Sequence, residues 1–229
     1  MSCSSSMSVS TNAPPRPTPA LSAAASRVRP VAVTAAYSSS TASGRPLAAA
    51  ALNAGVGRGG AFLDIDIDDE VEIIDLNVTS TVRLAKLVLR DMAARDEGRV
   101  LITSSIASTM PGSFQAVYNA SKSFLQSFAE ALQNELKDTG ITITSLMPGP
   151  TATDFFRRAD MLDTKVGSDP TDDPAKVAKQ GFDALMKGKD KILGGGVATK
   201  TQGAAAKVLP DSVKAGMHRS MAEPGSADS

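Results

Sequence analysis

Two residues of this sequence have the types and the spacing needed to move a proton to or from a carbonyl oxygen. Tyr118 is one of two tyrosines in the 229 residues, and Lys122 follows it by four positions. On a helix, this spacing puts both side chains on one face. A phenol titrates near ~10 and a neighbouring ammonium stabilises the phenolate, so we expect the pKa of Tyr118 to be lowered towards neutral pH. Such a group can donate a proton as hydride reaches a carbonyl carbon, or accept one in the reverse direction.

Other polar residues stand where the pattern predicts strand ends. Ser105 ends the predicted strand in GRVLITSS and lies thirteen residues before Tyr118. The NAG turn at residues 53–55 closes an earlier apolar run, and the PG turn at residues 148–149 closes a later one. Open α/β sheets bind ligands at their carboxyl edge, so we expect these turns to meet there. Asn77 is a polar residue among apolar neighbours on a predicted helix. It either serves this site or bonds the backbone at a helix irregularity.

The ordered set NAG, Asn77, SS, YNASK and PGPTAT resembles the short-chain dehydrogenase/reductase family in order and spacing, over roughly residues 46–200. The resemblance implies an oxidoreductase that transfers hydride between NAD or NADP and a small-molecule carbonyl or secondary alcohol. It also implies a catalytic tetrad of Asn77, Ser105, Tyr118 and Lys122. In that scheme Tyr118 is the acid/base and Ser105 orients the substrate oxygen. Lys122 lowers the pKa of Tyr118 and grips the nicotinamide ribose, while Asn77 holds a water that links Lys122 to solvent.

The same resemblance implies a set of cofactor-binding residues. Thr151 and Thr153 match the family positions that hold the nicotinamide amide, and Pro148 and Gly149 precede them in the same turn. The other residues that the resemblance assigns to the cofactor are Asn53, Ala54 and Gly55, beside its adenosine side, together with Tyr118 and Lys122. One departure is small, because the family usually has a second Asn where Leu52 stands.

A larger departure concerns the N-terminal half of the family fold. Family members open with a strand, a Gly-x-x-x-Gly-x-Gly turn and two more strands, but only 52 residues precede Asn53 here and they lack that Gly triplet. The turn normally supplies backbone N–H groups to the pyrophosphate. Two interpretations stay open: an enzyme of this family, or a truncated, non-catalytic fragment acting at most as an association module. We expect a homo-oligomer through the helices near 69–95 and 115–139, which form the family's subunit interface. The first remaining strand is expected to be an open, apolar edge.

Residues 1–46 are rich in Ser, Ala, Pro, Thr and Arg and show no sustained period, which predicts a low-complexity, disordered segment. Three origins stay open: a plain tail, an organelle transit peptide, or out-of-frame coding sequence in place of a structured half-domain. The expected location is the cytoplasm, or an organelle if the segment is a transit peptide.

Beyond residue 46, strands alternate with helices, which predicts an α/β fold. The fold class is a partial Rossmann-like, doubly wound parallel sheet that corresponds to strands 4 to 7 of the family fold. Strands are expected in PLAAAALN, GRVLITSS, ITITSLMPGP and KILGG, and helices over 68–95, from 115 to a stop at Gly140, and over 174–187. Residues 47–197 form the predicted catalytic region. Residues 198–229 form a partly helical C-terminal extension, with a helix over 203–222 broken at Pro210.

Composition excludes several classes of function. With 24 basic and 24 acidic residues the formal net charge is zero, which argues against nucleic acid or an anionic membrane as a partner. A single Cys3 and a single His218 leave no thiolate or histidine cluster, so no metal is expected. The chain has no apolar run of ~18 residues that could span a membrane. His218 lies in a polar C-terminal region and is expected to be an ordinary surface histidine.

Five large apolar residues lie in loops that are expected to cover the pocket: Met110, Phe114, Phe155, Phe156 and Met161. They indicate either an apolar substrate or ordinary packing of the core.

Overall fold

The computed structural model describes residues 44, 46–206 and 208–228. The interpretation of residues 1–46 therefore lies, apart from residues 44 and 46, outside the described part of the chain. Within that part, four strands form one parallel sheet in the order β1-β2-β3-β4. The strands are β1 (Ala49–Leu52), β2 (Gly98–Thr103), β3 (Ile141–Pro148) and β4 (Lys191–Gly194). The predicted α/β class and parallel sheet are confirmed.

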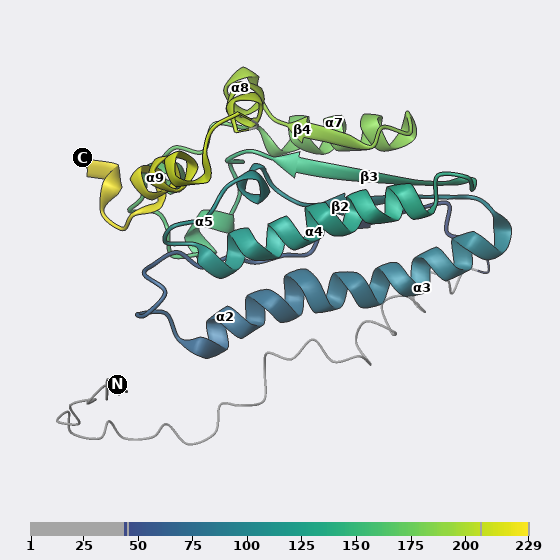
Figure 1. The fold of residues 1–229 in the computed structure, drawn as a ribbon, viewed down its shortest axis with the longest axis horizontal. Coiled ribbons are helices and arrows are strands. Elements are labelled where there is room, and N and C mark those ends of the chain that lie inside the picture. The colour runs from purple at the N-terminus through teal and green to yellow at the C-terminus, as the bar shows by residue number, and fades with distance from the viewer. Residues whose placement is uncertain (1–43, 45, 207, 229) are drawn as a thin grey trace, which may run out of the picture.

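Helices connect successive strands and cover both faces of the sheet (Figure 1). The helical elements are α2 (Ile67–Ile73), η1 (Ile74–Thr79), α3 (Ser80–Arg95), η2 (Ile106–Thr109), α4 (Ala116–Glu135), α5 (Phe155–Arg158), α6 (Lys165–Ser168), α7 (Pro174–Met186), α8 (Val197–Ala205), α9 (Asp211–Ala222) and η3 (Ser226–Asp228). Parallel neighbours cannot be joined by a tight turn, so each successive pair of strands is connected by a crossover that contains a helix.

The long helix predicted over 68–95 is a continuous rod with an irregular middle. Its N-cap is Asp66, whose carboxylate accepts a hydrogen bond from the Asp68 backbone N–H at 2.8 Å. Asp68 and Asp69 occupy the positively polarised first turn, as the sequence predicts. Between α2 and α3 the rod passes through the π-helical segment η1, which contains Asn77. Such π segments inside α-helices often lie at functional sites.

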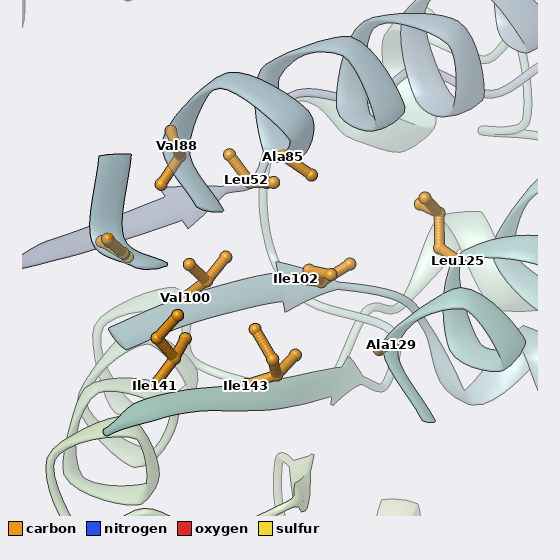
Figure 2. Close-up of a cluster of buried hydrophobic side chains, with 10 residues drawn as sticks. Leu52, Ala85, Val88, Val100, Ile102, Leu125, Ala129, Ile141 and Ile143 are labelled. Carbon is orange, nitrogen blue, oxygen red and sulfur yellow. The ribbon is translucent and has the colours of Figure 1, made fainter. Parts of the chain in front are cut away.

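One face of the sheet packs against α3 and α4, which run beside each other as long helices in Figure 1. Figure 2 shows the side chains of this cluster pointing into one layer between strands and helices. The buried members are Leu52, Ala85, Val88, Met92, Val100, Ile102, Leu125, Ala129, Ile141 and Ile143. Burial of apolar area at ~25 cal/mol per Å² makes this layer the main stabilising feature of the domain.

The opposite face packs against α7. Leu101 and Leu146 project from β2 and β3 onto Val177 and Leu185 of that helix. Gly181 lets the helix approach closely, since a Cβ there would lie 2.9 Å from the Leu146 side chain. Helices on both faces confirm the predicted double winding.

Some predicted boundaries were wrong. The helix expected to run to Gly140 ends at Glu135. Gly140 instead lies against Asp96, whose backbone is in the left-handed region, and a Cβ on Gly140 would clash with the Asp96 carbonyl oxygen. The Asp- and Pro-rich loop after β3 contains the short helices α5 and α6, which were not predicted.

The C-terminal region is helical, as predicted, and Pro210 separates its two helices, α8 and α9. The first of them begins at Val197, six residues earlier than expected. The proposed boundary at 197/198 falls at the start of this helix. The second C-terminal helix, α9, packs against α6. None of the helices in the described ranges is both long and apolar enough to cross a membrane.

Candidate active site

The predicted site residues meet at the carboxyl edge of the sheet, around a cavity of about 660 Å³. The sequence-predicted residues that line it are Asn53, Gly55, Ser105, Tyr118, Lys122, Pro148, Gly149, Thr151 and Thr153. Two predicted residues do not line it: Ala54 is exposed, and Asn77 is fully buried behind the cavity wall. The strand ends therefore bring together residues that are up to a hundred positions apart in the sequence.

Tyr118 lies on the first turn of α4, half-buried, with its side chain lining the cavity. Burial raises the pKa of Tyr118 to about 12, and a hydrogen bond with the Ser105 side chain acts more weakly in the opposite direction. The predicted direction was wrong, because desolvation of the phenolate outweighs the neighbouring cation. At neutral pH the phenol is therefore protonated, which is the state that can donate a proton.

Lys122 lies one turn further along α4 and is 5% exposed. Its ammonium donates a hydrogen bond to the Thr103 carbonyl oxygen at 3.1 Å and lies 5.8 Å from the centre of the Tyr118 ring. Burial lowers the pKa of Lys122 to about 8, because the charged form loses hydration. The ammonium form still predominates at neutral pH.

Asn77 makes three hydrogen bonds that connect separate elements. Its Oδ1 accepts from the Val56 backbone N–H at 2.9 Å, and its Nδ2 donates to the Val56 carbonyl at 2.9 Å and to Ser121 Oγ at 2.9 Å. The Ser121 hydroxyl in turn donates to the Tyr118 carbonyl at 2.7 Å. Asn77 thus bonds the backbone of Val56 from the π-helical segment η1, and through Ser121 it ties the turn after β1 to α4.

Two glycines of that turn permit close approach to the site. A Cβ on Gly55 would lie 3.1 Å from Asn77 Oδ1 and 3.2 Å from Lys122 Nζ. A Cβ on Gly57 would lie 2.6 Å from the Phe155 ring and 3.1 Å from the Tyr118 ring. The GVGRGG segment predicts a turn, but the sequence does not indicate which of its glycines approaches the site.

The loop after β3 is held by Asp172, a residue that the sequence did not single out. Asp172 is buried, and its backbone forms a bridge with Thr151. Its carboxylate accepts from the Gly196 N–H at 2.6 Å and from the Thr199 hydroxyl at 2.5 Å, at the N-terminus of α8. The carboxylate thereby satisfies the positive end of that helix and joins the loops after β3 and β4. Nothing in the sequence distinguishes Asp172 from the other Asp residues of this loop, so its role could not be predicted.

The five apolar loop residues divide between the two interpretations offered for them. Met110, Phe155 and Phe156 line the cavity, and the Phe155 ring lies 5.2 Å from the Tyr118 ring. Met161 is fully buried in a cluster against which Phe114 packs, and neither residue lines the cavity. The cavity therefore has an apolar side formed by three of the five.

The expectation for His218 was wrong. The residue lies on α9 with 6% exposure, and it lines the same cavity as Tyr118. Its polar sequence neighbours gave no sign of burial, since they lie on the outer side of the helix.

The donor set of the cavity fits the nicotinamide end of a dinucleotide cofactor. Tyr118 and Lys122 would offer a hydroxyl and an ammonium to ribose oxygens, and Thr151 would offer a further hydroxyl. In the described ranges, the Gly-rich turn that leads onto a helix is Gly194–Gly196 before α8, and the Asp172 carboxylate already fills that helix N-terminus. No group of three or more His, Cys, Asp or Glu side chains in the described part could hold a metal ion.

Known sequences that resemble this chain belong to proteins of the same kind of fold. The sequence model of a family described as short chain dehydrogenase matches residues 27–161. The 3-oxoacyl-(acyl-carrier-protein) reductase FabG of Escherichia coli is 37% identical over 86 residues, which are 38% of this chain and 35% of the reductase. The aligned stretch thus spans about a third of the length of that relative.

Solved structures show the same fold. A short-chain dehydrogenase from Streptomyces avermitilis superimposes with a TM-score of 0.67 and 20% identity, covering 84% of this chain and 76% of that one. The closed form of serine dehydrogenase complexed with NADP+ superimposes with a TM-score of 0.66 and 22% identity, covering 74% of this chain and 73% of that one. At these identities the likeness concerns the fold alone.

Proposed function

The chain belongs to the short-chain dehydrogenase family, and we propose that it transfers hydride between NAD(P)(H) and a small-molecule carbonyl or secondary alcohol. The observation that carries the proposal is the meeting of Ser105, Tyr118 and Lys122 around one cavity at the carboxyl edge of the sheet. These residues come from two elements that pack together only in the folded chain. The similarity to the FabG reductase supports the same reaction type.

Tyr118 and Ser105 would act on the substrate oxygen. Both side chains line the cavity, and Ser105 lies close enough to Tyr118 to lower its pKa, so an oxygen placed between the two hydroxyls can accept from both. Ser105 would hold the carbonyl in line, and Tyr118 would donate its proton as negative charge develops on the oxygen. A bound nicotinamide would supply the hydride in this chemistry.

Lys122 would stabilise the Tyr118 oxygen once the proton has left. Its ammonium is buried with a neutral carbonyl as its hydrogen-bond partner, so its positive charge is not cancelled by a carboxylate there. An uncancelled charge acts strongly across a desolvated site. The same ammonium is available to ribose hydroxyls.

The residues that would hold the cofactor are Asn53, Ala54 and Gly55 at the end of β1, and Pro148, Gly149, Thr151 and Thr153 after β3. Asn53 already has a fixed orientation, because its Oδ1 accepts from the Thr103 hydroxyl at 2.9 Å. Thr151 is held likewise, since its hydroxyl donates to the Gly149 carbonyl at 2.9 Å. Fixed side chains lose little entropy on binding.

The raised pKa of Tyr118 favours carbonyl reduction at neutral pH. Reduction needs a protonated phenol, and a pKa of about 12 keeps the group protonated. Alcohol oxidation needs a phenolate, whose population grows about tenfold for each unit of pH below the pKa. We therefore propose carbonyl reduction as the neutral-pH direction.

A second candidate function is association without catalysis. The outer faces of the long helices carry exposed apolar side chains, including Val71, Ile74 and Phe124, and the Phe124 ring stacks on Phe128 at 5.9 Å. Such a surface suits contact with a second copy of the chain. Homo-oligomerisation through this surface is compatible with either function.

Direct cofactor binding distinguishes the two functions. Calorimetric titration of the full chain with NADH and with NADPH should detect binding of one of them at or below millimolar concentration. In turnover assays with simple ketones, Tyr118→Phe should lower kcat by about 10²- to 10⁴-fold, because a general acid contributes that much. Cofactor affinity should fall far less, because only one hydroxyl contact to the ribose is lost. No binding of either cofactor would sink the enzyme proposal, and undiminished turnover in the variant would remove Tyr118 from its role.

A further inference from the structure

His218 has one ring nitrogen fixed by the protein. Its Nδ1 lies 2.9 Å from the Ser113 carbonyl oxygen. A carbonyl oxygen can only accept a hydrogen bond, so Nδ1 carries the proton and Nε2 is left as an acceptor in the neutral ring. Burial also holds the pKa of His218 below its usual range, with the bond to Ser113 acting more weakly in the opposite direction.

The helix that carries His218 is docked firmly enough to hold the ring in place. Besides the ring contact, the Ser113 hydroxyl donates to the Ala215 carbonyl of α9 at 3.3 Å. Arg219 lies over the Phe114 ring at 5.2 Å, and Ala222 is buried in the cluster around Phe156. Polar and apolar contacts therefore fix α9 on both sides of the histidine.

Nε2 is an acceptor that the rest of the site does not use. Among the residues that the structure describes, none makes a hydrogen bond or an ion pair with this atom, although His218 is more than nine-tenths buried. The ring lines the cavity together with the apolar Phe156, Met221 and Ala222. Nε2 is accessible from the cavity, so water can reach it until a ligand covers it. A ligand that donates to Nε2 replaces that water, whereas one that covers Nε2 without donating leaves the acceptor desolvated and loses affinity.

We infer that His218 selects substrates that carry a hydrogen-bond donor, such as a hydroxyl group, on an apolar body at a distance from the reacting carbonyl. The inference rests on the proposed function for the position of that carbonyl, beside Ser105 and Tyr118. The apolar lining receives the body of the substrate, and Nε2 accepts from its second polar group. Analogues without the donor leave Nε2 unpaired and bind more weakly.

The test uses linear methyl ketones of increasing chain length, each with and without a terminal hydroxyl. His218 is the only histidine in the sequence, so nitrogen NMR of the full chain gives a single imidazole to follow. We expect the Nδ1-protonated tautomer, and a shift of the Nε2 resonance with hydroxylated ketones of one length range but not with their partners. This readout needs neither turnover nor a variant that folds.

Kinetics provide the second readout. The kcat/KM of the wild-type chain should favour the hydroxylated ketone of a matched pair by about 3- to 10-fold, mostly through KM. His218→Phe should abolish this preference, and His218→Gln should retain part of it, because its amide can both donate to Ser113 and accept. Ser220→Ala, at an exposed position of the same helix, is the control and should keep the full preference.

The outcomes separate the inference from the proposed function. Turnover with no hydroxyl preference, unchanged in His218→Phe, would overturn the inference and leave the enzyme proposal intact. A hydroxyl-dependent Nε2 shift without any turnover would support the donor site and contradict the enzyme proposal.

Discussion

Replacing Asn77 by Ala removes the connection between the turn after β1 and the catalytic helix. The three hydrogen bonds of the side chain, each 2.9 Å long, reach Val56 N–H, the Val56 carbonyl and Ser121 Oγ. Each such bond contributes about 1 kcal/mol net, so their loss should lower the free energy of unfolding by about 3 kcal/mol. Asn77 is fully buried, so water cannot readily replace the amide.

Urea unfolding of the variants measures this effect. Ser121→Ala removes the bond from Asn77 and also the bond of the Ser121 hydroxyl to the Tyr118 carbonyl, so it should lower the free energy of unfolding by about 2 kcal/mol. Asn77→Asp keeps the acceptor for Val56 N–H but sets a carboxylate oxygen against the Val56 carbonyl, so it should be at least as destabilising as Ala. Cofactor affinity should fall with Asn77→Ala, because Val56, the residue after the NAG turn, loses its hydrogen bonds to residue 77.

Asn119→Ala is the matched control. This second buried Asn of the same region bonds the carbonyls of Ala107 and Met110 instead of the NAG turn. It should lower stability and leave the affinity for cofactor nearly unchanged. If Asn77→Ala unfolds within ~0.5 kcal/mol of the wild type, or if both variants lose affinity equally, the positioning role assigned to Asn77 is refuted.

Three further substitutions test the surroundings of the site. Gly57→Ala should push the Phe155 ring away from Tyr118 and lower the free energy of unfolding by about 1 to 3 kcal/mol. In a Phe155→Ala background, most of this loss should disappear. If the two losses simply add in urea unfolding, the contact between residue 57 and Phe155 is contradicted. Asp172→Asn should lower the unfolding free energy by about 1.5 to 3 kcal/mol, because both bonds lose the charge of the carboxylate and the Thr199 hydroxyl must turn to accept from the amide. An unchanged urea midpoint would show that the carboxylate is dispensable. The pKa of Lys122 is about 8 in the fold and ordinarily near 10.5, so between these pH values the unfolded chain binds more protons than the folded chain, and the free energy of unfolding should rise with pH. Lys122→Met should abolish this rise. A rise that persists in the variant would show that another group causes it.

Elements with a strong local pattern could be predicted from the sequence. The strands GRVLIT and ITITSLMP are short runs rich in β-branched and apolar residues. The first begins at Gly98 and ends at Thr103, two residues before the predicted end, and the second follows Gly140 and ends at Pro148. The interior of the long helices follows from apolar residues at three- and four-residue steps. Helix ends were less certain: the stop at Gly140 was wrong because that glycine is required by a close approach to Asp96, which no local pattern encodes.

The sequence predicted which residues the fold brings to one cavity, Ala54 and Asn77 excepted, but not the electrostatics of that cavity. The spacing of Tyr118 and Lys122 indicates proximity, whereas the pKa of Tyr118 depends on how much solvent the fold removes, and burial is a property of the whole fold. The same limit explains His218, whose burial results from docking of α9 against a loop about a hundred residues earlier. Asp172 acts through the backbone of Gly196 and Thr151 and through the Thr199 hydroxyl, and no local sequence pattern links these residues to it.

The central claim is that Tyr118 protonates a carbonyl oxygen while a nicotinamide delivers hydride to its carbon. The most direct measurement is transfer of deuterium from cofactor labelled at the nicotinamide C4 to a ketone, with the alcohol product detected by mass spectrometry. We predict a deuterated alcohol with the wild-type chain and a loss of about 10²-fold or more with Tyr118→Phe. No deuterated product from the wild type under cofactor saturation, or equal yields from both chains, would contradict the account.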